Sequence, residues 1–260
     1  MPGTDTDQNE TAVTVQNRDG RGPVLIVCEH ASNAMPARYG NLGLPSDLLD
    51  SHIAWDPGAL AIAQSLSGAM DGPLVAGGLS RLLFDCNRPP HAPDAMPQRS
   101  EIHDIPGNRN LSENERAHRI ETIHDPFRKT LQQVLAGFAR PPVMITVHSF
   151  TPVYRGRTRD VEIGLIHDSD DRLTRAMMSC VRNHTDRTVR VNDPYGPQDG
   201  VTHTLRAHAL PINAFNVMLE IRNDLIRDPA AQTAMASLLT GWIAAACAEL
   251  DVDLPLVEPT

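Results

Sequence analysis

The sequence predicts an α/β protein with three layers, α/β/α, around a mainly parallel, mixed sheet. Several runs, such as VLIVCEH at residues 24–30, are almost continuously apolar, which is typical of strands buried on both faces of a sheet. These runs alternate along the chain with segments of helical periodicity. We therefore expect residues 22–260 to form a single domain, preceded by a flexible tail over residues 1–21.

The first half of the chain begins with the strand at residues 24–30. Apolar positions at helical spacing predict a helix over residues 57–70, with Pro57 near its start. Residues 72–87 are expected to contain two short strands. Residues 88–110 are rich in Pro, Asn and Asp and predict a long irregular loop, and loops of that length inside a domain are usually functional.

A long helical region is expected over residues 111–139. Ser112 is a good N-cap, and Glu115 three residues later completes a capping box. Pro126 lies inside this region and is expected to break or kink the helix, because proline lacks the backbone donor that a helix interior needs.

The second half of the chain repeats the alternation of strands and helices. Strands are expected in residues 142–150 and 160–168, followed by a helix in 171–185. Residues 189–209 should contain a strand, a loop and a short helix. A further strand is expected at the end of 212–225, and an apolar helix in 234–250.

Composition narrows the location and the partners. The chain has 260 residues, is 41% hydrophobic and 21% charged, and carries a net charge of −9, which argues against nucleic acid or an anionic membrane as a main partner. Its four cysteines form no C-x-x-C pair and are interpreted as buried thiols of a reducing compartment. The polar start does not look like a signal peptide, and residues 234–250 are too short to span a bilayer. We expect a cytoplasmic protein.

Two histidines follow apolar strands. His30 comes after the run at 24–28 and His148 lies near the end of the run at 142–150. In open α/β sheets the chemistry lies at the carboxyl ends of strands, and imidazole is the commonest transition-metal ligand. The two side chains could supply two of the three protein ligands of a catalytic zinc ion. The alternative is two histidines in ordinary loops.

Glu220 and Arg222 lie two residues apart in LEIRNDL, so both side chains point to one face of a strand. They could form a structural ion pair. Glu220 could instead be a general base for a water molecule beside a metal ion, with Arg222 next to it as a candidate substrate ligand.

A third polar group lies in SRLLFDCNRPP. Asp85 and Asn87 would share one face of a strand end, with Arg88 after them and Arg81 upstream. Because a guanidinium fits a carboxylate with two parallel hydrogen bonds, this segment suits an acidic substrate group. The alternative is a turn with a solvated arginine.

The segments CEHASN, SRLLFDCNRPP, VHSF and LEIRND, in this order, resemble the N-formylglutamate amidohydrolase family, in particular its more divergent branch. The resemblance covers about residues 22–250. That family is similar in turn to the zinc carboxypeptidases, which implies a zinc-exopeptidase-like (phosphorylase/hydrolase-like) fold.

The resemblance also implies roles for individual residues. His30 and His148 would bind zinc, Asn87 and Arg88 would grip a substrate carboxylate, and Glu220 would be the general base. Arg81 could steady the oxyanion or a second carboxylate.

The chain departs from the family pattern in two places. Zinc peptidases of this type have His-x-x-Glu, and here Asn33 occupies the position of that glutamate, although a neutral amide is a poor zinc ligand. Asp56 is the first candidate for the third ligand, although it could be a helix N-cap, and Glu29 is the second. The main branch also reads His-Ser-Gly where this chain reads His-Ala-Ser. His208, close to His203 in GVTHTLRAHA, could flank the pocket and contact substrate.

We therefore expect a zinc-dependent amidohydrolase that cleaves a small-molecule N-acyl amino acid, with N-formylglutamate giving formate and glutamate. Another divalent metal is compatible with the same ligands. Two alternatives remain: a hydrolase of another N-acyl amino acid or a short peptide, and a non-catalytic protein that binds a metal or a ligand.

Overall fold

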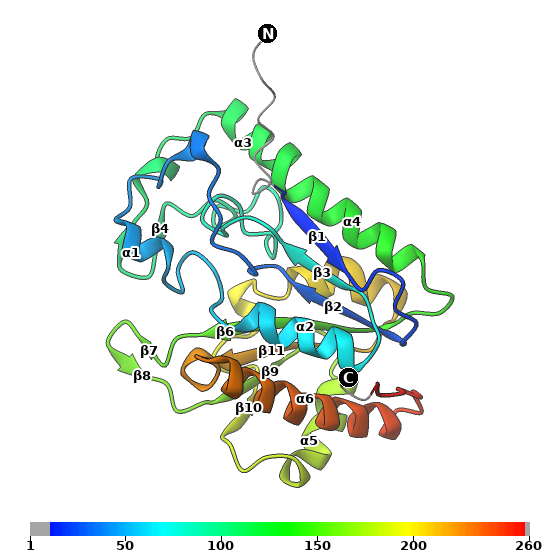
Figure 1. Cartoon of the computed structure of the whole chain (residues 1–260). Coiled ribbons are helices and arrows are strands. Elements are labelled where there is room, and N and C mark those ends of the chain that lie inside the picture. The colour runs from blue at the N-terminus through cyan, green and yellow to red at the C-terminus, as the bar shows by residue number, and fades with distance from the viewer. Residues whose placement is uncertain (1–10, 258–260) are drawn as a thin grey trace.

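A seven-stranded sheet runs through the centre of the protein (Figure 1). The structure is a computed structural model and describes residues 11–257. The strand order is β1-β3-β2-β6-β11-β9-β10, and all neighbours are parallel except β1 with β3 and β9 with β11. The predicted mixed, mainly parallel sheet is confirmed. The strands are β1 (Val13–Gln16), β2 (Val24–Cys28), β3 (Leu74–Gly77), β6 (Val143–Phe150), β9 (Ile163–Ile166), β10 (Val189–Val191) and β11 (Asn216–Arg222).

The central strands are apolar on both faces because each face has its own core. Along β2, Val24, Ile26 and Cys28 point into one hydrophobic cluster, and Leu25 and Val27 point into the other. This alternation between two buried faces explains why the strand sequence is continuously hydrophobic rather than half polar.

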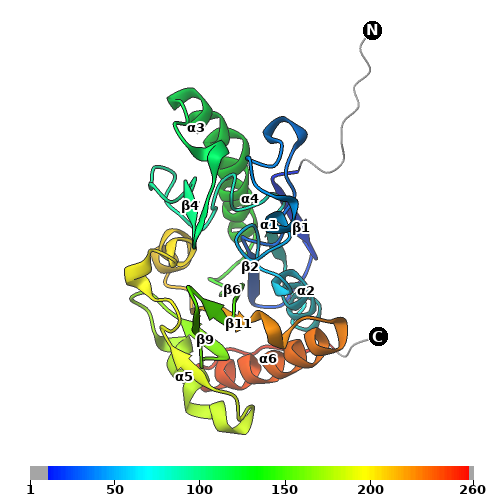
Figure 2. The ribbon, with the colours of Figure 1, turned by 90° about the vertical axis from the view of Figure 1, so that its left-hand side faces the viewer.

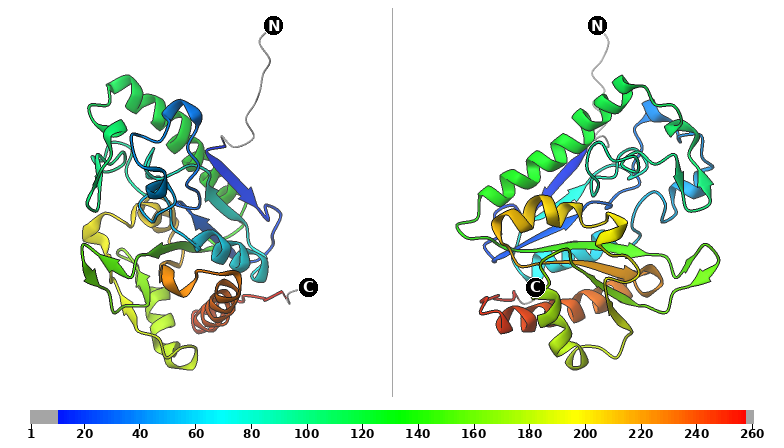
Figure 3. Two further views of the ribbon diagram at one scale, coloured as in Figure 1. Left: turned by 60° about the vertical axis from the view of Figure 1, so that its left-hand side comes forward. Right: turned by 180° about the vertical axis from the view of Figure 1, so that it is seen from behind.

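Helices cover both faces and complete the three layers (Figure 2). On one face lie α2 (Ala59–Ala69), α5 (Arg172–Cys180) and α6 (Pro229–Glu249). On the other lie α3 (Glu113–Arg119) and α4 (Asp125–Ala136), and in the view from behind α4 crosses above the sheet while α6 lies below it (Figure 3).

Helix α6 is longer than the sequence indicated. It begins at Pro229, where the carboxylate of Asp228 accepts a hydrogen bond from the backbone N–H of Ala231 at 2.9 Å. Within residues 11–257 it is the one helix long and apolar enough to cross a membrane by length and composition. It packs against α2 and α5, and the buried indole of Trp242 donates to the carbonyl oxygen of Met177 at 2.7 Å.

The helical region of residues 111–139 is interrupted as expected. The Ser112 hydroxyl caps α3 by accepting from the backbone N–H of Glu115 at 3.2 Å. A π-helical turn, Ile120–His124, separates α3 from α4. The π turn runs on into α4 with helical backbone angles, and Pro126 lies in the first turn of α4, so the helix changes its winding next to the proline and does not break.

Two expectations about local structure are wrong. Residues 72–87 contain one strand, β3, and not two, because Ser80 turns the chain: its carbonyl accepts from the N–H of Leu83, and its hydroxyl donates to the carbonyl of Ala54. The apolar residues that suggested a strand are buried in this turn. Part of the expected tail, Val13–Gln16, is strand β1, while residues 1–10 lie outside the described residues.

Loops gather at the edge of the sheet where β2 and β6 end. They carry the short helix α1 (Ser46–Leu49) and two hairpins, β4–β5 (Arg99–Ser100 and His103–Asp104) and β7–β8 (Val153–Tyr154 and Arg157–Thr158), which Figure 1 shows on the left. The chain leaves β2 through α2 on one face and enters β6 from α4 on the other. This is a topological switch point, where open α/β sheets bind their ligands.

Candidate metal centre and active site

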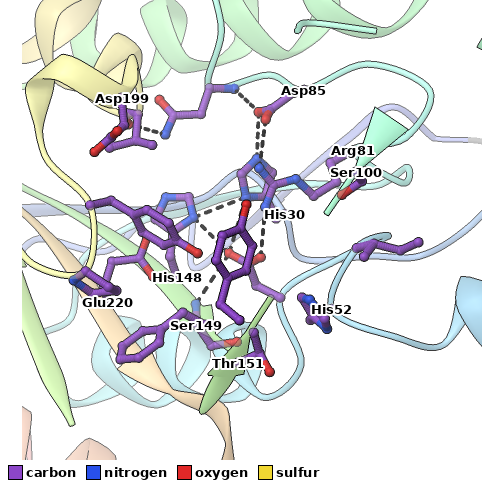
Figure 4. A pocket seen from close by; sticks show the side chains of 18 of the residues that line it. His30, His52, Arg81, Asp85, Ser100, His148, Ser149, Thr151, Asp199 and Glu220 are labelled. Atoms are coloured by element: carbon purple, nitrogen blue, oxygen red, sulfur yellow. Dashed lines mark hydrogen bonds and ion pairs between the residues drawn. The ribbon is translucent and has the colours of Figure 1, made fainter. Parts of the chain in front are cut away.

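Three buried side chains meet at the switch point (Figure 4). His30 follows β2, His148 lies on the adjacent strand β6, and Asp56 precedes α2, where its backbone N–H donates to the carbonyl of His30. The Nδ1 atoms of the two histidines are 3.2 Å apart. Asp56 Oδ2 lies 3.2 Å from Nδ1 of His30 and 2.9 Å from Nδ1 of His148.

The outer nitrogen of each imidazole faces a second carboxylate. Nε2 of His30 lies 2.7 Å from Oδ1 of Asp85, and Nε2 of His148 lies 3.1 Å from Oε2 of Glu29. Asp85 thus holds a proton on Nε2 of His30 by a hydrogen bond, and Glu29 favours one on Nε2 of His148 by its charge, without hydrogen-bond geometry; the lone pair of each Nδ1 is then directed inward. This carboxylate–histidine arrangement is the usual support of metal-ligating histidines.

The inward atoms fit a metal ion. Two imidazole lone pairs and a carboxylate oxygen repel one another at 2.9–3.2 Å unless a cation or protons lie between them. Ligand atoms bound tetrahedrally to zinc at about 2.0–2.1 Å lie roughly 3.3 Å from each other, so the observed triangle needs little adjustment. The three residues form a group that could hold a metal ion.

Burial and mutual attraction set the pKa values of this group. Burial alone would raise the pKa of Asp56, but His30 and His148 lower it well below its ordinary value. Burial alone would lower the pKa of His148, but the carboxylates of Glu29 and Asp56 raise it well above its ordinary value. In the absence of a metal, protons take the place of the cation.

Glu220 lies beside the three residues. It is on β11, in register with His148 on β6, and it is buried. Its Oε2 has no hydrogen-bond partner among residues 11–257, and burial, reinforced by the negative charge of Asp56, raises its pKa to about 7. The carboxyl faces the same pocket as the histidines (Figure 4). A carboxyl with this pKa suits a general base near neutral pH.

Arg81 holds two of these acids in place. Its guanidinium lies 3.3 Å from Oδ1 of Asp56 and 2.9 Å from Oδ2 of Asp85, and its side chain remains 27% exposed to the pocket. The arginine therefore fixes both a candidate metal ligand and the support of His30.

The structure gives Asn87 and Arg88 local partners. The Asn87 amide donates to the carbonyl of Val201 and accepts from the backbone N–H of Thr204, so both of its ends are used. Arg88 lines the pocket, with Nε 2.6 Å from the carboxylate of Asp94. Both residues lie in a turn rather than at a strand end, so the expected alternation with Asp85 is absent.

Four other sequence candidates lie away from the inward-facing atoms. Asn33 donates to Leu49 and Asp50, and Glu29 supports His148 from behind. Arg222 pairs with Asp224 at 2.8 Å and is not in the pocket wall. His208 lies with His203 on a separate small cavity, and burial lowers its pKa to about 4.

A pocket of about 490 Å³ lies over His30, Asp56 and His148. Its wall includes an arginine that the sequence did not reveal, Arg159, whose guanidinium carbon lies 5.4, 4.5 and 4.9 Å from the ring centres of Phe150, Tyr154 and Tyr195. Burial, followed by the charge of Glu220, raises the pKa of Tyr195 to about 12, so its phenol is neutral. Arg159 follows the β7–β8 hairpin, whose sequence shows no hydrophobic periodicity that would have predicted it.

Glu101 joins three loops at the edge of this pocket. Its Oε1 accepts from the backbone N–H of Arg155 on the β7–β8 hairpin at 2.9 Å, and its Oε2 lies 3.0 Å from Nε2 of His52. Glu101 itself belongs to the turn between β4 and β5.

The fold and the site together define a three-layer α/β protein with a candidate metal centre at the switch point of its sheet. The model of the N-formylglutamate amidohydrolase family matches residues 22–227, and the chain belongs to this family. It is an amidohydrolase, as the sequence predicted.

Two solved structures are similar over almost the whole chain. A gene product of Agrobacterium tumefaciens is 51% identical, with a TM-score of 0.92, over 95% of this chain and 98% of that one. The N-formylglutamate amidohydrolase of Ralstonia eutropha JMP134 is 18% identical, with a TM-score of 0.67, over 92% and 99%, a likeness of fold. No curated protein matches the chain.

Proposed function

We propose that the protein is a zinc-dependent hydrolase of an N-acyl amino acid of the N-formylglutamate type, which would yield formate and glutamate from that substrate. His30, Asp56 and His148 would hold the zinc ion. The observation that carries the proposal is the triangle of inward-facing ligand atoms beside Glu220, a buried carboxyl with a pKa of about 7.

Each group of the chain has a task in this reaction. A bound zinc ion supplies a Lewis acid that polarises the scissile carbonyl and lowers the pKa of a water molecule. Glu220 takes the proton of the attacking water at its free Oε2 and passes it to the leaving amine. Arg81, which is still partly exposed to the pocket, offers its remaining N–H groups to the oxyanion.

Arg88 is the proposed ligand of the substrate α-carboxylate. Its Nε is taken by Asp94, and its Nη1 donates to the carbonyls of Asn87 and Gly200. The far end of the guanidinium remains for the substrate. Asn87 contributes indirectly, because its amide fixes the segment at residues 201–204 against Arg88.

Metal content and product release test the proposal. The wild-type protein should contain about one zinc ion per chain and release formate from N-formylglutamate. His148→Ala should lose both, whereas His118→Ala, at an exposed histidine of α3, should lose neither. Glu220→Gln should keep the metal and lose about 10²–10⁴-fold in kcat. A wild-type protein that takes up no metal would refute the zinc site.

A panel of substrates separates the remaining functions. Release of acid from another N-acyl amino acid or a short peptide, but not from N-formylglutamate, would keep the chemistry and change the substrate. Bound metal without hydrolysis of any of them would favour a non-catalytic binding protein. The free thiols of the described residues fit the cytoplasmic location that we propose for the enzyme.

A further inference from the structure

Three arginines line the pocket, and two of them already have carboxylate partners. Arg81 is held by two aspartates, and Arg88 by Asp94. Arg159 forms no ion pair with a carboxylate within residues 11–257. Its Nη1 donates to the carbonyl of Thr151 at 3.4 Å, and its side chain is also hydrogen-bonded to the phenol of Tyr195. A cation in a pocket wall without an acidic neighbour is a candidate binding group for an anion.

Aromatic side chains surround the guanidinium of Arg159. Three aromatic rings, those of Phe150, Tyr154 and Tyr195, lie within 5.4 Å of its central carbon. Contacts to the faces of aromatic rings satisfy the π surface of a guanidinium, and the in-plane N–H groups that are not used by Thr151 and Tyr195 remain available. These are the groups that form two parallel hydrogen bonds with a carboxylate.

The backbone of Arg159 is also fixed. Its N–H donates to the carbonyl of Pro152 at 2.9 Å, and its own carbonyl accepts from Nη1 of Arg222 at 3.1 Å. Arg222, which the sequence suggested as a substrate ligand, thus positions the arginine that faces the pocket. A preorganised binding group loses less entropy when its ligand arrives.

The charge of the pocket also favours Arg159 as the group that binds an anion. Its wall contains more carboxylates than arginines: Asp56, Asp85, Asp94, Glu101, Asp199 and Glu220. An acidic substrate would be repelled by this excess unless a cation without a carboxylate partner of its own received it. Within the pocket wall that cation is Arg159.

We propose that Arg159 binds the side-chain carboxylate of the substrate and makes the enzyme selective for N-acyl amino acids with an acidic side chain. This inference rests on the proposed function, with Arg88 as the ligand of the α-carboxylate. Tyr154 and Tyr195 act indirectly, because their rings contact and position the guanidinium that binds the carboxylate.

Paired substrates and paired variants test this assignment. N-formylglutamate and N-formylglutamine differ only in the charge of the side chain. Wild-type enzyme should prefer N-formylglutamate, and Arg159→Met should lower its kcat/KM by roughly 10- to 150-fold, mainly through KM, because a charge-assisted hydrogen-bonded contact is lost. The kcat/KM for N-formylglutamine should stay within about 2-fold.

Arg157→Met is the matched control, because Arg157 lies on the same hairpin, is exposed and does not line the pocket. It removes the same charge and should change neither substrate. Zinc content and thermal melting should be unchanged in both variants. An equal loss for the two substrates in Arg159→Met would assign Arg159 a structural role and overturn the inference, as would an unchanged preference for N-formylglutamate.

A failure of the proposed function can be distinguished from a failure of the Arg159 assignment. A wild-type protein that hydrolyses neither compound refutes the reaction but leaves the binding assignment open to calorimetry. Wild type should then bind N-formylglutamate more tightly than N-formylglutamine, and Arg159→Met should bind both alike. Equal binding by the wild type would overturn the assignment.

Discussion

His30 and His148 each lie between two carboxylates. Asp56 faces the Nδ1 atoms of both rings, while Asp85 lies behind His30 and Glu29 behind His148. The inner carboxylate can accept a metal ion together with the imidazoles, and the outer ones fix the tautomer. Removing one of the outer carboxylates should therefore weaken metal binding without removing a ligand.

We expect Asp85→Asn to lower zinc affinity by about 10–100-fold, the usual effect of losing an outer partner of a ligating histidine. A neutral amide holds the Nε2 proton of His30 less firmly and no longer pairs with Arg81. Competition with a chelator measures the affinity. Asp94→Asn is the control, since Asp94 is 57% exposed and pairs only with Arg88. Equal affinities of Asp85→Asn and wild type would refute the supporting role.

The sequence pointed to the candidate metal-binding and catalytic residues more readily than to the carboxylates behind them. His30, His148 and Glu220 were found because polar residues in apolar strands are conspicuous. The roles of Asp85 and Glu29 depend on which side of an imidazole they reach, and only the packing of β2 against the turn after β3 decides that. Arg159 follows a polar hairpin without any periodic signal, so the sequence offered no way to place it in the pocket.

Strands β2 and β3 approach each other closely where they end at the site. A Cβ atom added at Gly77, the last residue of β3, would lie 2.1 Å from the carbonyl oxygen of Glu29. That oxygen is backbone, next to His30, and cannot move without shifting the metal ligands. Gly77 is therefore required for the close approach of the two strand ends.

We expect Gly77→Ala to destabilise the protein by about 1–3 kcal/mol, the usual cost of overpacking, and to weaken zinc binding. Gly68→Ala is the control: it lies inside α2, with no atom within 4 Å of the added Cβ. It should stabilise the helix by about 0.5–1 kcal/mol. Urea denaturation of both variants gives the comparison, and a neutral Gly77→Ala would show that the strand ends have room to spare.

The strands that are buried on both faces were all predicted, because apolar residues run through them without interruption. Strand β1 was missed because its four residues, VTVQ, are only partly buried and pair on one side. The apolar run LLF at residues 82–84 looked like a strand but is buried in a turn. A short hydrophobic run indicates burial, and long-range contacts decide its conformation.

At the scale of the whole molecule, the metal-type centre ties together β2, β6 and the start of α2. A ligand that binds only the folded state stabilises it, so zinc should raise the melting temperature and a chelator should lower it. The size of this shift should depend on pH.

Without metal, the pKa of His148 is raised, because Glu29 and Asp56 outweigh the effect of burial. This contribution to stability is complete below the unfolded pKa and is lost as pH rises through the folded pKa. Zinc needs the neutral imidazole, so it binds better as pH rises. The zinc-induced shift in melting temperature should be larger at pH 8 than at pH 6, as scanning calorimetry can show. His148→Ala should show no shift at either pH, and a wild-type shift that shrinks with pH would contradict this account.

The contact of Glu101 with both Arg155 and His52 makes the rim of the pocket continuous across three loops. An enzyme that cuts in the middle of a polypeptide needs a trench open at both ends, so that the chain can enter on one side and leave on the other. Here the carboxylate of Glu101 links neighbouring loops along one side of the rim. A rim linked in this way suits the small-molecule substrate that we propose, or the end of a chain, better than a segment in the middle of one.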